Sequence, residues 1–404
     1  MIDRIKRFAN QNKICYYIIY VLFNIYGLFF SVLCFMMRVF PIQKNKIVCC
    51  NMKGKRYGDN PKYIVDEILR EHLPYEIVWL IKKDTDIDLP EGIRPANYNP
   101  FSMAYELTTA KIWIDSNTKP LGVLKRKGQY YIQTWHGSYG LKKMYGDIPD
   151  KMNLFDKRNI QYNSKIQDLF VSNSTFYSEI YRRAFWYKGE ILQSGSPRND
   201  IFFTENNECI AKVQDYFHTQ GKKMALYAPT YRNDFGTDAY RLDFERMRKN
   251  FEKRFGGEWV ILVRLHPHNL MDAEQFMQYN DTIINATSYS VMQELLVACD
   301  VLISDYSSCM FDFVTTGKPC FMYASDAAQY KEEHDFYFNI YELPFPLAEN
   351  NDEMEDRILK FDETVYEDNL QKLFHKVGLC ENGVACKQVV EWIQTRLISE
   401  VKGK

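Results

Sequence analysis

The stretch Tyr130-Tyr131-Ile132-Gln133-Thr134-Trp135-His136-Gly137 decides the fold class, because an apolar run of strand length ends in a polar turn that carries a histidine. Similar apolar runs recur at 47–50, 76–81, 111–115 and 169–172, and again at 224–227, 260–263, 282–284, 301–303 and 320–323. Stretches of helical character separate them. This alternation predicts βα units, and therefore an α/β protein with two Rossmann-like, doubly wound lobes.

The chain has 404 residues, a length that suits two domains and an appendage. A polar interval at 204–208 separates the two series of apolar runs. We therefore expect a membrane-associating segment at 1–43, a first lobe at 44–205 and a second lobe at 206–404.

The segment from Ile14 to Met37 has no charged side chain and is long enough to cross a hydrocarbon core of ~30 Å. Basic residues flank it on both sides, so charge gives no orientation, and both a spanning helix and an in-plane helix stay open. Residues 1–62 hold eleven Lys and Arg against two Asp. Because this charge brackets an apolar segment, it favours membrane phosphates as the partner over nucleic acid.

The ten cysteines are scattered, and no two of them have the C-x-x-C spacing. Neither a zinc site nor a disulfide framework is predicted. Free thiols fit a reducing compartment, and we expect the protein at the cytoplasmic side of the cell membrane.

His136 follows a predicted strand, where open α/β sheets place residues that contact ligands, and Gly137 allows close backbone approach. An imidazole titrates near neutral pH and is suited to take a proton from an attacking hydroxyl. The alternative is a histidine that hydrogen-bonds the backbone of a turn.

A second histidine stretch, Arg264-Leu265-His266-Pro267-His268, follows the run at 260–263. Its spacing differs from that of helical zinc ligands and no carboxylate lies between the histidines, so no metal is predicted. His266 and His268, with Arg264, are candidates to stabilise charge on a leaving phosphate. A purely structural turn is open for one of the two.

The turn Ser304-Asp305-Tyr306-Ser307-Ser308 leads from a predicted strand into a helix, a position suited to phosphate, although serine caps are common. We take Asp305, Ser307 and Ser308 as candidate substrate-binding residues. Arg198 and the pair Thr230 and Arg232 follow strand–proline turns and are further candidates. The alternative for the arginines is an ordinary surface position or a structural ion pair with Asp200 or Asp234.

Several segments together resemble the CDP-glycerol glycerophosphotransferase family, the teichoic acid primases and polymerases of Gram-positive bacteria. They are Gly54-Lys55-Arg56-Tyr57-Gly58-Asp59-Asn60-Pro61, Thr134-Trp135-His136-Gly137, Tyr181-Arg182-Arg183-Ala184-Phe185, Gly195-Ser196-Pro197-Arg198-Asn199-Asp200, Ala228-Pro229-Thr230-Tyr231-Arg232, His266-Pro267-His268 and Asp305-Tyr306-Ser307-Ser308 with Phe311-Asp312.

The resemblance implies a GT-B-like pair of lobes, peripheral membrane attachment and transfer of glycerol phosphate from CDP-glycerol without a bound metal or other cofactor. It implies His136 as the base, and it implies that His266 or His268 holds the donor diphosphate together with Ser307 and Ser308, with CMP as the leaving group. The first lobe would hold the acceptor and the second lobe the CDP-polyol.

We therefore expect a polyol phosphate transferase of teichoic acid or capsular polymer synthesis at the inner face of the cell membrane. CDP-glycerol and CDP-ribitol are both candidate donors, and a polyprenyl-linked glycan or a growing polyol-phosphate chain is the candidate acceptor. A GT-B glycosyltransferase that uses a nucleotide sugar is one alternative. A non-catalytic membrane scaffold is another.

Overall fold

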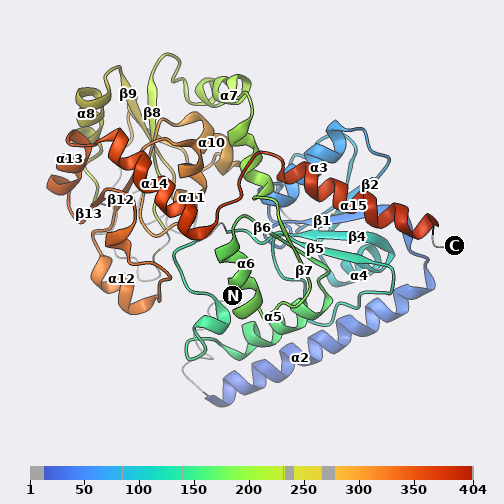
Figure 1. Cartoon of the computed structure of the whole chain (residues 1–404). Helices are drawn as coiled ribbons and strands as arrows, with labels where there is room; N and C mark the ends of the chain where they lie inside the picture. Colours follow the sequence, from blue (N-terminus) through green and yellow to red (C-terminus); the bar gives the residue numbers. More distant parts are fainter. Residues whose placement is uncertain are drawn as a thin grey trace.

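The computed structural model describes residues 13–83, 85–137, 140–230, 232, 241–265 and 278–402. These residues form two α/β lobes that lie side by side, each built on its own parallel sheet (Figure 1). The predicted fold class is therefore confirmed.

The first lobe has a sheet of seven parallel strands in the order β3-β2-β1-β4-β5-β6-β7. The strands are β1 (Gln43–Cys50), β2 (Glu76–Ile81), β3 (Ile93–Asn97), β4 (Ala110–Asp115), β5 (Tyr130–Gln133), β6 (Leu169–Ser172) and β7 (Glu190–Gln193). The helices of this part of the chain are α2 (Lys13–Met36), α3 (Asp59–Arg70), α4 (Pro100–Thr109), α5 (Leu154–Ile166) and α6 (Thr175–Arg183).

The central strands of the first sheet are apolar on both faces, as expected where helices cover each side. In β1, Ile47 and Cys49 pack in one core, whereas Val48 and Cys50 pack in the core on the opposite face. Helix α3 contributes to the first of these cores, and α2 and α4 contribute to the second. The sheet therefore sits between two helical layers.

The second lobe has six parallel strands in the order β10-β9-β8-β11-β12-β13. The strands are β8 (Lys223–Tyr227), β9 (Trp259–Val263), β10 (Ile283–Asn285), β11 (Val301–Ser304), β12 (Cys320–Tyr323) and β13 (Leu347–Ala348). The helices are α7 (Asn207–Phe217), α8 (Phe244–Phe255), α10 (Met292–Ala298), α11 (Cys309–Phe313), α12 (Ala327–Glu333), α13 (Asn351–Leu359) and α14 (Glu363–Val377).

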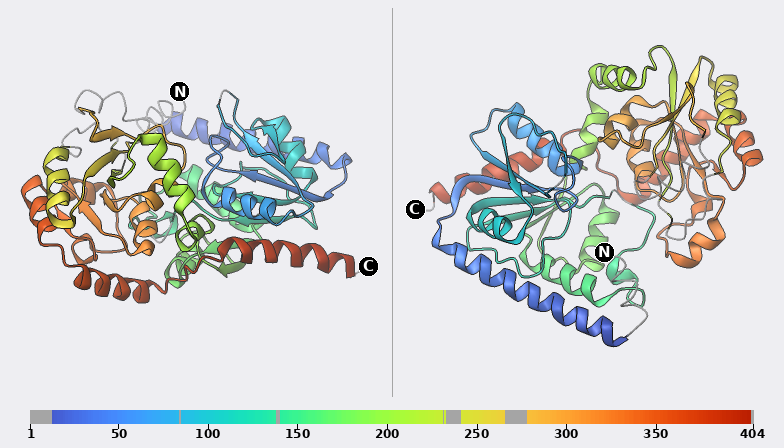
Figure 2. Two further views of the ribbon diagram at one scale, coloured as in Figure 1. Left: turned by 90° about the horizontal axis from the view of Figure 1, so that it is seen from above. Right: turned by 180° about the vertical axis from the view of Figure 1, so that it is seen from behind.

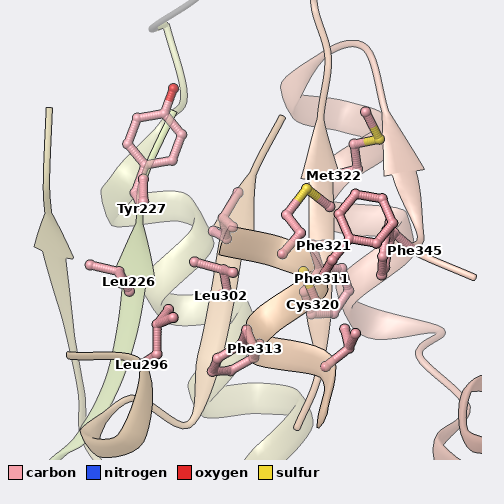
Figure 3. Close-up of a cluster of buried hydrophobic side chains, with 14 of the residues drawn as sticks. Leu226, Tyr227, Leu296, Leu302, Phe311, Phe313, Cys320, Phe321, Met322 and Phe345 are labelled. Carbon is pink, nitrogen blue, oxygen red and sulfur yellow. The ribbon is translucent and has the colours of Figure 1, made fainter. Parts of the chain in front are cut away.

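Helix α11 is short, but its aromatic side chains anchor it to the second sheet. Phe311 and Phe313 are buried among Leu302 of β11 and Phe321 of β12 (Figure 3). This packing fixes the turn between β11 and α11, which faces the lobe junction.

The long apolar helix α2 lies along the outside of the first lobe instead of projecting from it (Figures 1 and 2). At Gly27 it passes so close to Gly122 that a Cβ added at Gly122 would lie 1.9 Å from the Gly27 carbonyl oxygen. The Ser31 hydroxyl donates to the carbonyl oxygens of Gly27 (3.0 Å) and Gly122 (2.8 Å). By length and composition, Lys13–Val39 is the one helical stretch of the described chain that could cross a membrane.

The chain passes between the lobes through η3 (Pro197–Phe203) and returns after α14. The returning segment ends in α15 (Ala385–Lys402), which packs on α3, and Val389 and Ile393 enter the core of the first lobe. The predicted range 206–404 placed this helix in the second lobe. The apolar face of α15 instead covers the first sheet, as Figure 2 also shows.

Candidate functional site

A cavity of about 400 Å³ lies between the lobes at the carboxyl ends of both sheets. This is where open parallel sheets bind ligands. Its lining residues come from both lobes: Asn51, Met52, Arg56, Gly58, Asp59, His136, Arg198, Ala228, Pro229, Arg264, Leu265, Thr287, Ser290, Val291, Met292, Gln293, Ser307, Ser308, Cys309 and Asp312.

His136 lines the cavity from the turn that follows β5. Its Nδ1–H donates to the carbonyl oxygen of Ser116, 2.8 Å away, an assignment that leaves Nε2 as the nitrogen with a free electron pair. Burial lowers the pKa of His136 below its ordinary value, against an opposing effect of the Ser116 carbonyl. The imidazole is therefore neutral at pH 7 and has the tautomer that a general base requires.

The His136 turn is held by the start of α3. The side chain of Asn60 donates to the carbonyl oxygens of Thr134 (3.3 Å) and Trp135 (3.2 Å). Trp135 adopts a left-handed backbone conformation, with φ of 53°, and its ring lies against the His136 ring at 4.3 Å. The imidazole is thus fixed from the backbone side and from one ring face.

Arg198 connects this turn to the second lobe. Its guanidinium donates to Asp59 (2.8 Å) and to the carbonyl oxygen of His136 (3.0 Å), and it pairs with Asp312 on α11 (2.7 Å). Burial would lower the pKa of Arg198, but Asp312 and Asp59 raise it above its ordinary value. The ion-pair alternative for Arg198 thus has partners other than Asp200.

Both crossings between the lobes meet at this buried cluster. Asn199, on the first crossing, donates to Asp312 (3.1 Å) and to Glu381 (2.9 Å), which lies on the returning segment. Glu381 also accepts from the side chain of Asn173 (3.1 Å). Burial raises the pKa of Glu381 to about 7.

The second lobe contributes Arg264, Ser307 and Ser308 to the cavity. Arg264 follows β9, and its backbone N–H donates to the carbonyl oxygen of Tyr227 (2.8 Å). Ser308 immediately precedes α11, but its side chain makes no capping hydrogen bond. The Ser308 hydroxyl is therefore not used by the helix, whereas the Ser307 hydroxyl accepts from the Cys309 N–H (3.4 Å).

Thr230, Arg232 and Asp305 form a separate cluster that does not line the cavity. Asp305 accepts from the Thr230 backbone N–H (2.8 Å) and from the Arg232 guanidinium (2.8 Å). Arg232 also pairs with Asp326 (2.6 Å) and lies over the Tyr330 ring at 4.6 Å. These residues brace the turns after β8 and β11.

Of the remaining predicted residues, Gly137 is described and does not line the cavity. His266 and His268 lie outside the described residues. Within the described part of the chain, no group of three or more His, Cys, Asp or Glu side chains is placed to hold a metal ion. A site that works without a metal stays a prediction.

The sequence analysis did not select several cavity residues as site residues. Asn51 and Arg56 lie between β1 and α3, and Asp59 is the first residue of α3. Thr287 follows β10, and Gln293 lies on α10. The segment containing Arg56 and Asp59 is one of those that resemble the family, and this resemblance was the only sequence feature that could have marked these two residues as site residues. Together the cavity offers a neutral imidazole on one side and guanidinium and hydroxyl donors on the other, an arrangement suited to attack on a bound phosphate.

Comparison with known proteins gives concordant matches. The family described as CDP-Glycerol:Poly(glycerophosphate) glycerophosphotransferase matches residues 32–395. The chain is 30% identical over 370 residues to the teichoic acid glycerol-phosphate transferase of Staphylococcus aureus (strain NCTC 8325 / PS 47), with 87% of this chain and 93% of that protein covered.

It is 29% identical over 367 residues to the teichoic acid poly(glycerol phosphate) polymerase of Staphylococcus epidermidis, with 87% of this chain covered. The chain spans about half (51%) of that polymerase's length. Among solved structures, a histidine-to-asparagine variant of the wall teichoic acid polymerase TagF soaked with CDPG matches with a TM-score of 0.79 and 26% identity, over 89% of this chain and 91% of that one.

Proposed function

The chain belongs to the CDP-glycerol:poly(glycerophosphate) glycerophosphotransferase family, and from this premise we propose that it transfers a polyol phosphate from a CDP-polyol to an acceptor hydroxyl. CMP is released and a phosphodiester forms, in the synthesis of teichoic acid or a related capsular polymer. CDP-glycerol is the first choice of donor, because the similar S. aureus and S. epidermidis proteins are named for glycerol phosphate.

One observation carries this proposal: the Nε2 atom of His136 is left as an acceptor in a cavity that Arg264, Ser307 and Ser308 line from the other lobe. The acceptor hydroxyl gives its proton to Nε2, and its oxygen attacks the phosphorus that carries the polyol. The bond from that phosphorus to the oxygen bridging the two phosphates breaks, and CMP leaves with the electron pair. The cationic and hydroxyl donors of the second lobe stabilise the charge that develops on CMP.

A donor screen tests the reaction class. The full chain is incubated with CDP-glycerol, CDP-ribitol and UDP-sugars in the presence of acceptor, and the nucleotide product is identified by mass. Polyol phosphate transfer releases CMP, because the bond between the two phosphates breaks. Release of a nucleoside diphosphate would instead identify a glycosyltransferase and contradict the proposal.

For the acceptor and the location, we propose that α2 holds the cavity next to the membrane and that the acceptor is a lipid-linked glycan or a growing chain at its inner face. Two features of α2 support an in-plane helix. Its apolar residues Ile18, Leu22, Ile25 and Phe29 are exposed, whereas Phe30 is buried against the first lobe. A helix that is packed on its own lobe along one face is suited to lie in the interface with the other face.

Vesicle binding tests the in-plane helix. Replacing Ile18, Leu22 and Ile25 with Ser should release the full chain from anionic phospholipid vesicles and lower turnover of a lipid-linked acceptor more than that of a soluble one. The matched control replaces Val365 and Tyr341, which are exposed on the second lobe. Equal loss of turnover on both acceptors would contradict this role of α2.

A further inference from the structure

Two arginines line the cavity from opposite lobes. Arg56 belongs to the turn between β1 and α3, and Arg264 is the first residue after β9. Arg56 is exposed, whereas Arg264 is half-buried. The reaction described above assigns no role to Arg56, and it does not assign a joint role to Arg56 and Arg264.

The Arg264 guanidinium lacks compensation within the described part of the chain. Its Nη1 is buried and has no hydrogen-bond partner there. Burial, and then the positive charge of Arg56, lowers the pKa of Arg264 to about 10. No carboxylate is among the described groups that shift the pKa of Arg264.

Two further arginines near the lobe junction are buried, and each of them is paired with two carboxylates. Arg198 has Asp59 and Asp312, and Arg232 has Asp305 and Asp326. Leaving a desolvated charge without a partner costs on the order of several kcal/mol. Arg264 carries this cost, and the exposed Arg56 adds a second positive charge to the same cavity, so the pair is suited to an anion that enters it.

The backbone presents Arg56 on a fixed turn. The Gly54 N–H donates to the Asn51 carbonyl oxygen (2.9 Å), and the Gly54 carbonyl accepts from the Lys82 N–H (2.7 Å). The Trp79 indole donates to the Arg56 carbonyl oxygen (3.3 Å). A Cβ at Gly54, where φ is +80°, would lie 2.8 Å from the Lys82 nitrogen, so the turn has little freedom to shift.

We propose that Arg56 and Arg264 form a clamp that binds the donor's diphosphate from opposite lobes, so that the first lobe takes part in donor binding as well as in base catalysis. This deepens the proposed function and rests on it. Guanidinium groups bind phosphate oxygens in a bidentate manner, and the two charges of a diphosphate diester match two arginines. Arg56 is thereby assigned as a donor-binding residue of the acceptor-side lobe.

Calorimetry on the full chain tests the clamp with three probes: CDP-glycerol, CMP and inorganic diphosphate. Arg56→Ala should lower the affinity for CDP-glycerol and for diphosphate at least about tenfold. The affinity for CMP should fall by less, because CMP has a single phosphate. Arg56→Lys should recover part of the affinity. Combining Arg56→Ala with Arg264→Ala should give less than the product of the single effects, because the two side chains bind one group.

The matched control is Lys55→Ala, an exposed neighbour that does not line the cavity. If Arg56→Ala binds CDP-glycerol and diphosphate as well as this control does, the clamp is wrong. A rise in acceptor KM with unchanged donor affinity also overturns it and assigns Arg56 to the acceptor. If the wild type binds diphosphate through Arg56 but binds no CDP-polyol, the clamp stands and the proposed function fails. Because Arg56 is exposed, its variant carries the test even if Arg264→Ala does not fold.

Discussion

Replacing Arg198 with Ala should strongly destabilise the protein, because it leaves two carboxylates without their cation. The Arg198 side chain is 6% exposed, and Asp312, 2.7 Å away, is 2% exposed. Asp59, at 2.8 Å, is 16% exposed and keeps some hydration. Breaking a buried ion pair by removing one partner costs ~3–5 kcal/mol. Most of this cost should come from Asp312, because it is the more deeply buried of the two carboxylates.

Urea unfolding at pH 7, followed by tryptophan fluorescence, measures this change from the transition midpoint and slope. The matched control is Arg183→Ala: Arg183 is 53% exposed and pairs with Asp147, so its loss should lower the free energy of unfolding by at most ~1 kcal/mol.

Removing Asp312 as well should give a double variant that is less destabilised than the sum of the single variants, by roughly 1–3 kcal/mol. The reasoning is refuted if Arg198→Ala costs no more than Arg183→Ala, or if the two changes at Arg198 and Asp312 are additive.

Three further predictions concern the base, the crossing segment and the apolar helix. Because burial lowers the pKa of His136, the neutral base is present at pH 7. We expect kcat/KM to fall only as the pH drops below the ordinary histidine pKa of ~6.5. A pH–rate profile whose acid limb lies above pH 7 would contradict this. Glu381, with a pKa raised to about 7, contributes stability below its unfolded pKa of ~4.3 that is lost as the pH rises to about 7. Glu381→Gln should therefore flatten the pH dependence of the unfolding free energy in that window, and an unchanged slope would count against the buried acid. Gly122→Ala, which places a Cβ 1.9 Å from the Gly27 carbonyl oxygen, should detach α2 and expose it to limited proteolysis; wild-type protection of α2 would show that the close contact is not needed.

The inner strands were predictable, whereas of the edge strands only β10 was marked by an apolar run, at 282–284. Runs such as 76–81, 169–172 and 320–323 coincide with β2, β6 and β12, because strands covered on both faces must be continuously apolar. The strands for which the sequence analysis gave no range, β3, β7 and β13, lie at sheet edges. In β3, Arg94 and Asn97 are exposed and Pro95 interrupts the pattern, so no apolar run marks it.

Helix α15 shows a different limit of sequence reasoning. Its apolar face has the same pattern whichever sheet it covers, because periodicity reports burial but not the partner. Its return to the first lobe depends on contacts between residues far apart in sequence. One example is Asp200, whose carboxylate accepts hydrogen bonds from the N–H groups of Ala385 (3.0 Å) and Cys386 (2.7 Å).

The candidate site was predictable where a residue follows a central strand. His136, Arg264, Ser307 and Ser308 line the cavity for that reason. Position alone did not distinguish ligand-facing residues from bracing ones. Asp305 also follows β11, but it accepts hydrogen bonds from Thr230 and Arg232 instead of facing the cavity. The direction of a side chain after a strand depends on the partners that the fold brings to it.

The central claim is that His136 of the first lobe takes the proton of the acceptor hydroxyl, whose oxygen attacks a donor diphosphate bound in the cavity between the lobes. The most direct test is the rate of CMP release from CDP-glycerol by His136→Ala at saturating donor and acceptor, with donor affinity measured on the same preparation. The account predicts that CMP release is abolished while CDP-glycerol still binds. Turnover at the wild-type rate by this variant would contradict it.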